Sequence, residues 1–217
     1  MFQNNFKFPS DTKAVIWDFD GVIKDSLAAK TGAFLHIFDS HANNDLLEKI
    51  KSHHLKNGGI SRSVKIPLYL KWLGIEPTKS NIDKYLDEFG KVVVELVVNS
   101  PWVKGVEKLL HKKNKGVMYF LITGTPTTEI YKILSKLSLL NPFTEIIGYP
   151  TEKFDATKGV IEKYNLSPKN IVYIGDSEID MRVSQMLNIP FILRLHADNM
   201  HLKNLHGGTS ITDFLIK

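Results

Sequence analysis

The chain has no cysteine and no long apolar segment. Without cysteine there are no disulfides and no thiolate metal sites, so the composition is typical of a protein from a reducing cytoplasm. The most apolar stretch, VVVELVV, is interrupted by Glu95 and falls far short of the ~20 residues that span a bilayer. The opening segment MFQNNFKFPSDTK does not resemble a secretory signal. The sequence therefore predicts a cytoplasmic protein with no membrane partner.

Long runs of basic residues are also missing. The formal net charge is +5, but no run of lysine and arginine reaches four residues. Such a mild excess of positive charge argues against nucleic acid as a partner and suits a small anionic substrate. With 217 residues, of which 43% are hydrophobic and 24% are charged, the chain can form one large domain or one domain with a smaller insertion.

Short apolar runs predict strands that are buried on both faces, because they do not alternate with polar residues. The runs cover residues 14–19, 116–123, 145–149, 170–176 and 190–195. Amphipathic helical patterns lie between them, for example PTTEIYKILSKL after the second run. Strands that alternate with helices predict an α/β fold, here a doubly wound, parallel, Rossmann-like sheet.

Residues 24–98 break this alternation, because they contain helical patterns but no convincing strand. We interpret them as an inserted all-helical cap subdomain. The Rossmann-like core then consists of residues 1–23 and 99–217. The expected hinges lie near Lys24–Ser26 and Asn99–Pro101.

Carboxylates come directly after two of the predicted strands. Asp18 and Asp20 end the first strand, and Asp176 ends the fourth. Gly21 follows the first two, allows a sharp turn beside them and is a candidate substrate-binding residue. The carboxyl ends of parallel strands meet at one edge of a sheet, where ligands bind. Three hard oxygen groups there suit Mg²⁺, which shares its coordination shell with a substrate phosphate. The competing interpretation is that these residues only cap helices or form turns, which is common for aspartate beside glycine.

The segment Thr123-Gly124-Thr125-Pro126 predicts a helix start, with Thr125 as N-cap and Pro126 as the first helical residue. Thr123 would then lie just before a helix N-terminus, where its hydroxyl and the backbone amides can hold a phosphoryl oxygen. A simple strand-to-helix turn is the alternative. In the insertion, Ser80 is the expected N-cap of the longest helix.

Ser177 and Asp180 form another helix-start pattern in IGDSEID. Ser177 could cap the following helix, with Asp180 as its reciprocal partner. Asp180 could instead stand behind a metal ion or a lysine and orient it. The two interpretations are compatible.

Four features occur along the chain in a characteristic order: DFDGVIKDS, LITGT, a lysine at the start of a helix, and IGDSEID. Together they resemble the four motifs of the haloacid dehalogenase (HAD) superfamily, and the match extends over nearly the whole chain. The helical insertion after the first motif resembles the cap of the phosphoglycolate phosphatase-like branch. The resemblance implies a phosphoric monoester hydrolase of HAD type.

The resemblance also implies a role for each matching residue. Asp18 is expected to be the nucleophile that becomes an aspartyl phosphate, and Asp20 the general acid and then the base. Thr123 and Gly124 are expected to bind the phosphoryl group of the substrate. Asp176 is expected to bind Mg²⁺ together with Asp18 and the backbone carbonyl of Asp20.

The active-site lysine has two candidates. Lys153 and Lys158 both lie in the matching segment, and an ammonium group there would neutralise the nucleophile and the transferring group. Lys158 opens KGVIEKY, which has the pattern of a helix start, so Lys158 is preferred and Lys153 is the alternative. For either residue, the competing interpretation is an ordinary surface lysine.

In the insertion, the segment HHLKNGGISRSVK resembles the substrate-facing loop of capped family members. Gly58-Gly59 predict a tight loop between two helices, and Arg62 suits a carboxylate or a second phosphate of the substrate. The alternative is that the glycines only end a helix and that Arg62 is solvated. No role is expected for a group of histidines, namely His53, His54, His196, His201 and His206.

These inferences predict a Mg²⁺-dependent phosphatase of a small phosphorylated metabolite, acting as a monomer or a homodimer. A phosphomutase for sugar phosphates is the alternative, because it uses the same aspartyl chemistry but protects the intermediate from water. A dehalogenase is disfavoured because that branch lacks the second aspartate, Asp20. A non-catalytic binding protein is disfavoured because an inactive site has no need to hold three carboxylates together.

Overall fold

The computed structural model describes residues 7–57, 60–112 and 116–215. The loop predicted at Gly58-Gly59 lies outside these residues. Among the described residues, no helix combines the length and the apolar character that crossing a membrane requires.

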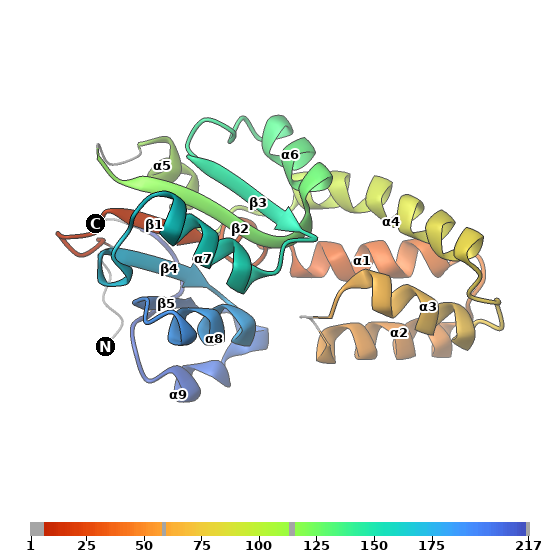
Figure 1. The fold of residues 1–217 in the computed structure, drawn as a ribbon. Coiled ribbons are helices and arrows are strands. Elements are labelled where there is room, and N and C mark those ends of the chain that lie inside the picture. The colour runs from red at the N-terminus through yellow and green to blue at the C-terminus, as the bar shows by residue number, and fades with distance from the viewer. Residues whose placement is uncertain (1–6, 58–59, 113–115, 216–217) are drawn as a thin grey trace. The chain divides into compact units, whose positions relative to one another are not determined.

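The chain divides into two compact units, which we call the α/β unit and the helical unit (Figure 1). The α/β unit consists of Met1–Asp25 and Pro101–Lys217, and the helical unit is Ser26–Ser100. The helical unit is therefore inserted into the α/β unit between its first strand and the rest of the sheet.

The α/β unit contains a six-stranded parallel sheet in the order β3-β2-β1-β4-β5-β6. Its strands are β1 (Ala14–Trp17), β2 (Met118–Pro126), β3 (Glu145–Tyr149), β4 (Ile171–Gly175), β5 (Phe191–Arg194) and β6 (Ser210–Ile211). The predicted doubly wound Rossmann-like α/β fold is confirmed, and each of the five predicted strands is present. The sixth, β6, was not predicted because two residues leave no pattern to detect.

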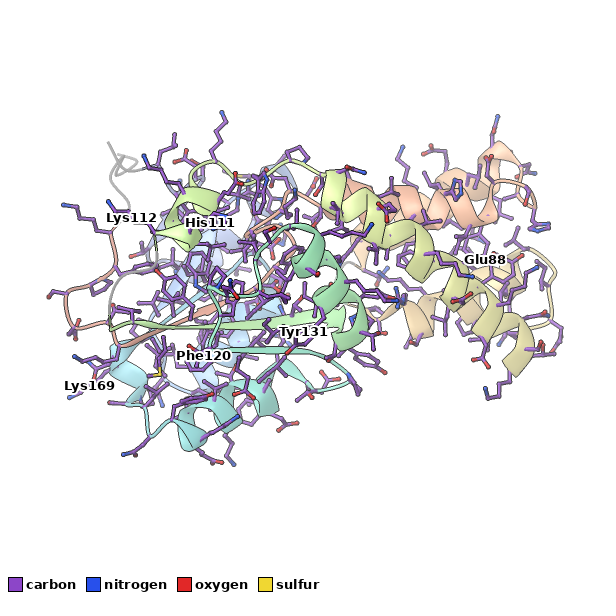
Figure 2. The ribbon with its side chains drawn as sticks, turned by 90° about the horizontal axis from the view of Figure 1, so that it is seen from above. Glu88, His111, Lys112, Phe120, Tyr131 and Lys169 are labelled. Atoms are coloured by element: carbon purple, nitrogen blue, oxygen red, sulfur yellow. The ribbon has the colours of Figure 1, made fainter. Side chains whose placement is uncertain are left out.

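Helices lie on both faces of this sheet, with α7 and α8 on one face and α5 and α6 on the other (Figures 1 and 2). The helices are α5 (Val106–His111), α6 (Thr127–Lys136), α7 (Lys153–Lys163), α8 (Glu178–Met186) and α9 (Leu202–His206), with 3-10 helices η1 (Pro168–Asn170) and η2 (Ala197–Asn199). Ile16, Phe120 and Tyr173 belong to the core beneath α7 and α8. On the other face Trp17 is fully buried. Figure 2 shows Phe120 among the core side chains, whereas Lys169 points outward. Burial on both faces explains why the central strands β1 and β4 are apolar throughout.

The helical unit is built around aromatic side chains. Its helices are α1 (Leu27–Phe38), α2 (Asn44–Lys56), α3 (Arg62–Trp72) and α4 (Lys79–Asn99). The ring of Phe34 lies 5.5 Å from Tyr69 and 4.5 Å from Phe89, measured between ring centroids. Phe38 stacks on Tyr85 at 5.2 Å. These contacts join α1, α3 and α4 into one apolar core.

We had predicted Ser80 as the N-cap of α4, but the N-cap is Thr78. Thr78 has an extended backbone, and its Oγ1 accepts a hydrogen bond of 3.2 Å from the amide of Asn81. Ser80 lies inside the first turn of the helix. Sequence patterns place helix ends only to within a few residues, and both residue types are good caps, so the structure was needed to choose between them.

Replacing the cap gives a stability prediction. Thr78→Ala should lower the free energy of unfolding by about 1 kcal/mol, because the amide of Asn81 loses its acceptor. Ser80→Ala is the matched control and should change the free energy by less than about 0.5 kcal/mol. Urea denaturation of both variants measures the difference, and equal losses would contradict the cap assignment.

A histidine and a lysine are buried together in the helical unit. The side chains of His54 and Lys65 are 8% and 1% exposed, and Lys65 Nζ lies 3.1 Å from His54 Nδ1. Burial, with the nearby charges of Lys65 and Lys30, lowers the pKa of His54 to about 3. Burial also lowers the pKa of Lys65 to about 8. The imidazole therefore stays neutral at pH 7 and accepts a hydrogen bond from the ammonium group.

The lowered pKa of His54 predicts how the stability of the protein depends on pH. In the unfolded chain His54 has an ordinary pKa of about 6.5, so below that pH the unfolded state binds a proton that the folded state does not. The free energy of unfolding should therefore decrease as the pH falls from about 6.5 to about 3, by up to about 1.4 kcal/mol per pH unit from this residue. His54→Gln should flatten this part of the profile in urea denaturation, whereas His41→Gln, at an exposed position, should not. Identical profiles for wild type and His54→Gln would contradict the assignment.

Candidate active site

The site lies at the carboxyl edge of β1, β2 and β4. Trp17 at the end of β1 is level with Leu121 in β2 and Ile174 in β4. The amide of Asp18 still donates to the carbonyl of Ile174, at 3.0 Å, and so continues the ladder. Because the strand order changes direction at β1, the residues that follow these three strands converge where α/β sheets bind ligands.

Gly21 provides the space that this convergence requires. Its φ angle is +77°, and a Cβ atom there would lie 2.0 Å from Oδ2 of Asp176. Any larger residue would therefore push Asp176 away from β1. The amide of Gly21 donates to the carbonyl of Lys24 at 2.7 Å, so it is already used within the turn. Gly21 thus contributes space beside the site, and its amide donates within the turn. The contact of Gly21 with substrate stays a prediction.

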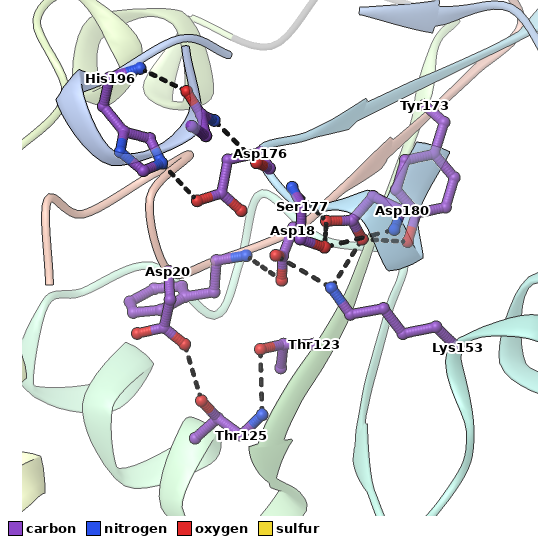
Figure 3. A network of polar contacts seen from close by, with 12 residues as sticks. Asp18, Asp20, Thr123, Thr125, Lys153, Tyr173, Asp176, Ser177, Asp180 and His196 are labelled. Carbon is purple, nitrogen blue, oxygen red and sulfur yellow. Dashed lines mark hydrogen bonds and ion pairs between the residues drawn. The ribbon is translucent and has the colours of Figure 1, made fainter. Parts of the chain in front are cut away.

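Asp18 and Asp20 have different partners, although the sequence makes them look alike (Figure 3). Asp18 Oδ1 accepts from the amide of Phe19 at 2.7 Å, and Asp18 Oδ2 lies 2.9 Å from Nζ of Lys153. Asp20 Oδ2 accepts instead from the hydroxyl of Thr125 at 2.9 Å. One carboxylate therefore faces a cation and the other a neutral hydroxyl group.

The segment after β2 differs from its prediction in one respect. Thr125 still belongs to β2, and α6 begins at Thr127 with Pro126 as its N-cap residue. The prediction of Thr125 as N-cap and Pro126 as first helical residue is therefore wrong by one position, because the strand continues further. Thr123 is buried and its Oγ1 accepts from the amide of Thr125 at 3.2 Å, whereas Gly124 is exposed.

The structure places Lys153 in the site and Lys158 outside it. Lys153 is the first residue of α7, and its Nζ lies 2.9 Å from Asp18 Oδ2 and 2.6 Å from Asp180 Oδ1. Lys158 lies on the exposed side of the same helix, 3.9 Å from Glu162. The preference for Lys158 is therefore corrected to Lys153. The helix begins one turn earlier than its sequence pattern suggested, and five residues turn a side chain about 140° around the axis.

Asp180 has both of the roles that the sequence allowed, as the capping partner of Ser177 and as a residue that orients a lysine. Oδ2 accepts from the amide of Ser177 at 3.2 Å and from its hydroxyl at 2.6 Å, which forms a capping box at the start of α8. Oδ1 accepts from Lys153 at 2.6 Å and from the Tyr173 hydroxyl at 3.0 Å. The carboxylate is fully buried, and each of its oxygens has two donors. Asp180 therefore holds the lysine that faces Asp18.

Asp176 is bound by a residue to which the sequence analysis assigned no role. Nε2 of His196 lies 3.0 Å from Asp176 Oδ2, as Figure 3 shows. His196, His201 and His206 recur every five residues, a spacing that does not keep one face of a helix, so the pattern offered no reason to assign them a role. The usable signal was the position of His196 directly after a predicted strand, at the same edge as Asp18 and Asp176.

Burial and the charges of neighbouring carboxylates raise the pKa values of Asp18 and Asp176. Burial raises the pKa of Asp18 well above its usual value; Lys153 opposes this shift, and Asp180, Asp176 and Asp20 add to it. Burial likewise raises the pKa of Asp176, and the hydrogen bond from His196 opposes the shift. Burial lowers the pKa of Lys153, but Asp18 and Asp180 outweigh it and hold the pKa above its usual value. The cluster is thus short of positive charge.

This donor set fits a divalent cation. Carboxylate oxygens of Asp18, Asp176 and Asp180 all lie within 4.8 Å of one another. Hard oxygen ligands of this kind suit Mg²⁺ or Ca²⁺ more than thiophilic metals. Asp20 is not one of these three residues, and its Oδ2 accepts from the Thr125 hydroxyl.

Comparison with known proteins identifies the family. A model of the haloacid dehalogenase-like hydrolase family matches residues 15–194, and the chain belongs to this family. The phosphoglycolate phosphatase of Pectobacterium atrosepticum is 23% identical over 138 residues, which are 58% of this chain and 57% of that protein. The match therefore spans little more than half the length of this curated relative.

Solved structures share the fold over almost the whole chain. A predicted phosphoglycolate phosphatase from Haemophilus somnus 129pt aligns with a TM-score of 0.78 and 18% identity, covering 95% of this chain and 96% of that chain. A protein assigned as a β-phosphoglucomutase from Thermotoga maritima aligns with a TM-score of 0.72 and 22% identity, covering 92% and 94%. The predictions of a HAD superfamily member of the phosphoglycolate phosphatase-like branch, and of an enzyme of this hydrolase class, are confirmed.

The two lysines of α7 allow a paired stability test. Lys153→Met should lower the free energy of unfolding by about 3–5 kcal/mol, because it leaves Asp18 and Asp180 buried beside each other without their cation. Lys158→Met should change it by less than about 1 kcal/mol, because its ion pair is exposed. Urea denaturation measures both. A loss below about 1 kcal/mol for Lys153→Met would contradict the role of Lys153 in neutralising the carboxylates.

Proposed function

We propose that the protein is a Mg²⁺-dependent phosphatase that hydrolyses the phosphate monoester of a small metabolite through an aspartyl-phosphate intermediate. The observation that carries the proposal is the different environment of two neighbouring carboxylates. Asp18 is buried against the ammonium group of Lys153, whereas Asp20 is bound to the Thr125 hydroxyl. Two carboxylates in different environments suit two different roles, a nucleophile and a proton-transfer group.

In the first step, a carboxylate oxygen of Asp18 attacks the phosphorus atom, and the bond between phosphorus and the ester oxygen breaks. The departing alkoxide takes a proton from Asp20. In the second step, Asp20 removes a proton from water, which attacks the aspartyl phosphate and releases inorganic phosphate. Both residues then return to their starting protonation states.

Groups around Asp18 can hold the phosphoryl oxygens. The Oγ1 atom of Thr123 accepts from the amide of Thr125, so its hydroxyl hydrogen remains for a phosphoryl oxygen. The exposed backbone at Gly124 can offer its amide to the same group. Lys153 neutralises the negative charge that Asp18 and the phosphoryl group share in the transition state. Positioning and charge neutralisation are the main requirements of phosphoryl transfer.

The cation would be held by the carboxylates of Asp18 and Asp176, with the backbone carbonyl of Asp20 as the further ligand that the family resemblance implies. Asp180 already accepts from Lys153, Tyr173 and Ser177, so it supports the lysine and leaves the metal to the other two. Bound Mg²⁺ supplies positive charge that neutralises the phosphoryl oxygens.

The substrate class is inferred from relatives and from charge. The curated relative reported above is a phosphoglycolate phosphatase, and the net charge of +5 suits a small anion. Arg62, at the start of α3 in the helical unit, is the proposed selectivity residue for a second anionic group of the substrate. Location in the cytoplasm and a monomeric or homodimeric state remain predictions of the sequence.

The alternative is a phosphomutase, which the fold shared with the Thermotoga maritima protein favours. A phosphomutase would convert a hexose 1-phosphate into its 6-phosphate in the presence of a bisphosphate primer and release little inorganic phosphate. Phosphorus NMR of the reaction mixture distinguishes the two activities. Dominant release of inorganic phosphate supports the phosphatase.

Two substitutions test the mechanism with p-nitrophenyl phosphate and Mg²⁺. Asp18→Asn should lower kcat by about 10³-fold or more, because the amide is a poor nucleophile. Asp20→Asn should accumulate the phosphoenzyme, because p-nitrophenolate leaves without a general acid while the attacking water loses its base. Intact-protein mass spectrometry detects the added phosphoryl group.

Asp155→Asn is the matched control, because Asp155 is an exposed carboxylate on α7, and it should leave kcat unchanged. Exhaustive chelation should abolish activity and Mg²⁺ should restore it. Full activity of Asp18→Asn would refute the nucleophile, and full activity after chelation would refute the metal requirement.

A further inference from the structure

The turn after β5 is built around an asparagine, Asn199, that is 4% exposed. Its Nδ2 donates to the backbone carbonyl of Asp176 at 2.7 Å and to that of Arg194 at 2.8 Å. Its Oδ1 accepts from the backbone amide of His196 at 2.8 Å. The amide of Asn199 therefore ties the chain after β5 to the chain after β4 and closes the turn on which His196 stands.

The same turn fixes the state of the His196 ring. Nδ1 accepts from the backbone amide of Asp198 at 3.3 Å, in the capping box at the start of η2. In the neutral ring the hydrogen is then on Nε2, which donates to Asp176 Oδ2 at 3.0 Å. The His196 side chain is only 14% exposed. The backbone thus aims a defined N–H donor at one oxygen of Asp176.

That oxygen is held from two sides. Oδ2 of Asp176 receives the His196 donor, and it lies where a Cβ atom on Gly21 would approach to 2.0 Å. The contacts of Oδ2 with His196 and with the backbone at Gly21 restrict the rotation of the Asp176 carboxylate, which belongs to the same carboxylate group as Asp18. A carboxylate that is fixed in this way loses little conformational entropy when it binds a cation.

We propose that His196 and Asn199 are positioning residues for the metal site, an inference that rests on the proposed function. His196 orients the carboxylate of Asp176 through Oδ2, and Asn199 holds the backbone of Asp176 and the turn that carries His196. Neither residue contacts the reacting atoms. Both act through Asp176, so their effect should be on cation affinity and much less on the affinity for the phosphate ester.

The test is Mg²⁺ binding to the purified, substrate-free full chain, measured by isothermal titration calorimetry. His196→Leu introduces an apolar side chain of similar size and removes the N–H donor. It should raise the Mg²⁺ dissociation constant by about 10–100-fold. His196→Gln can place a side-chain N–H near the position of Nε2 and should restore the dissociation constant to within about 5-fold of wild type. His201→Leu is the matched control, because His201 is an exposed histidine in the same region, and it should have no effect.

Kinetics provide an independent readout. With p-nitrophenyl phosphate, His196→Leu should raise the Mg²⁺ concentration for half-maximal activity in parallel with the dissociation constant, while KM for the ester at saturating Mg²⁺ stays within about 2-fold of wild type. Asn199→Ala should show the same pattern with a lower melting temperature, since it also opens the turn.

Two results would overturn the inference. One is a Mg²⁺ dissociation constant for His196→Leu within about 2-fold of wild type. If this variant also had a lower melting temperature in the presence of chelator, His196 would stabilise the fold without affecting the metal site. The other is wild-type protein that binds no Mg²⁺, which would also remove the metal from the proposed function. Wild-type protein that binds Mg²⁺ but hydrolyses no ester would refute the proposed function alone. Should His196→Leu not fold, His196→Ala replaces it with the same expectation.

Discussion

The structure of the α/β unit depends on one electrostatic constraint, which is the gathering of carboxylates at a single edge of the sheet. Asp18, Asp20, Asp176 and Asp180 are all at most 8% exposed, and Lys153, whose side chain is 13% exposed, lies beside two of them. Buried charges without partners are costly, so each carboxylate needs donors close by. The polar contacts of this region are best understood as meeting that need, and the proposed cation would complete the neutralisation.

Structural and chemical roles are combined in the same residues. The capping box between Ser177 and Asp180 begins α8, and the same carboxylate, together with Tyr173, holds Lys153 at the first turn of α7. The starts of two helices therefore set the position of the ammonium group that faces Asp18. Small displacements of either helix would change the charge balance of the site without any change in its residues.

In the helical unit, a buried lysine lies beside a neutral side chain instead of carboxylates. Lys65 is buried beside a neutral imidazole, at His54, and near the ring of Phe34, and its pKa falls to about 8 because burial disfavours the ammonium form. In the α/β unit, by contrast, the carboxylates around Lys153 hold its pKa above the usual value. The surroundings thus lower the pKa of one lysine and raise that of another, a difference that neither composition nor sequence pattern reveals.

The sequence by itself determined the α/β class, the five main strands, the helical character of the insertion and the carboxylates at strand ends such as Asp18 and Asp176. These features follow from local patterns, because a strand buried on both faces must be apolar and its first polar residues mark its end. Only the tertiary structure decided that Lys153 rather than Lys158 reaches the site and that His196 binds Asp176. Both depend on where a helix or turn begins relative to strands that are distant in the chain, and that relation is set by three-dimensional packing rather than by any local pattern.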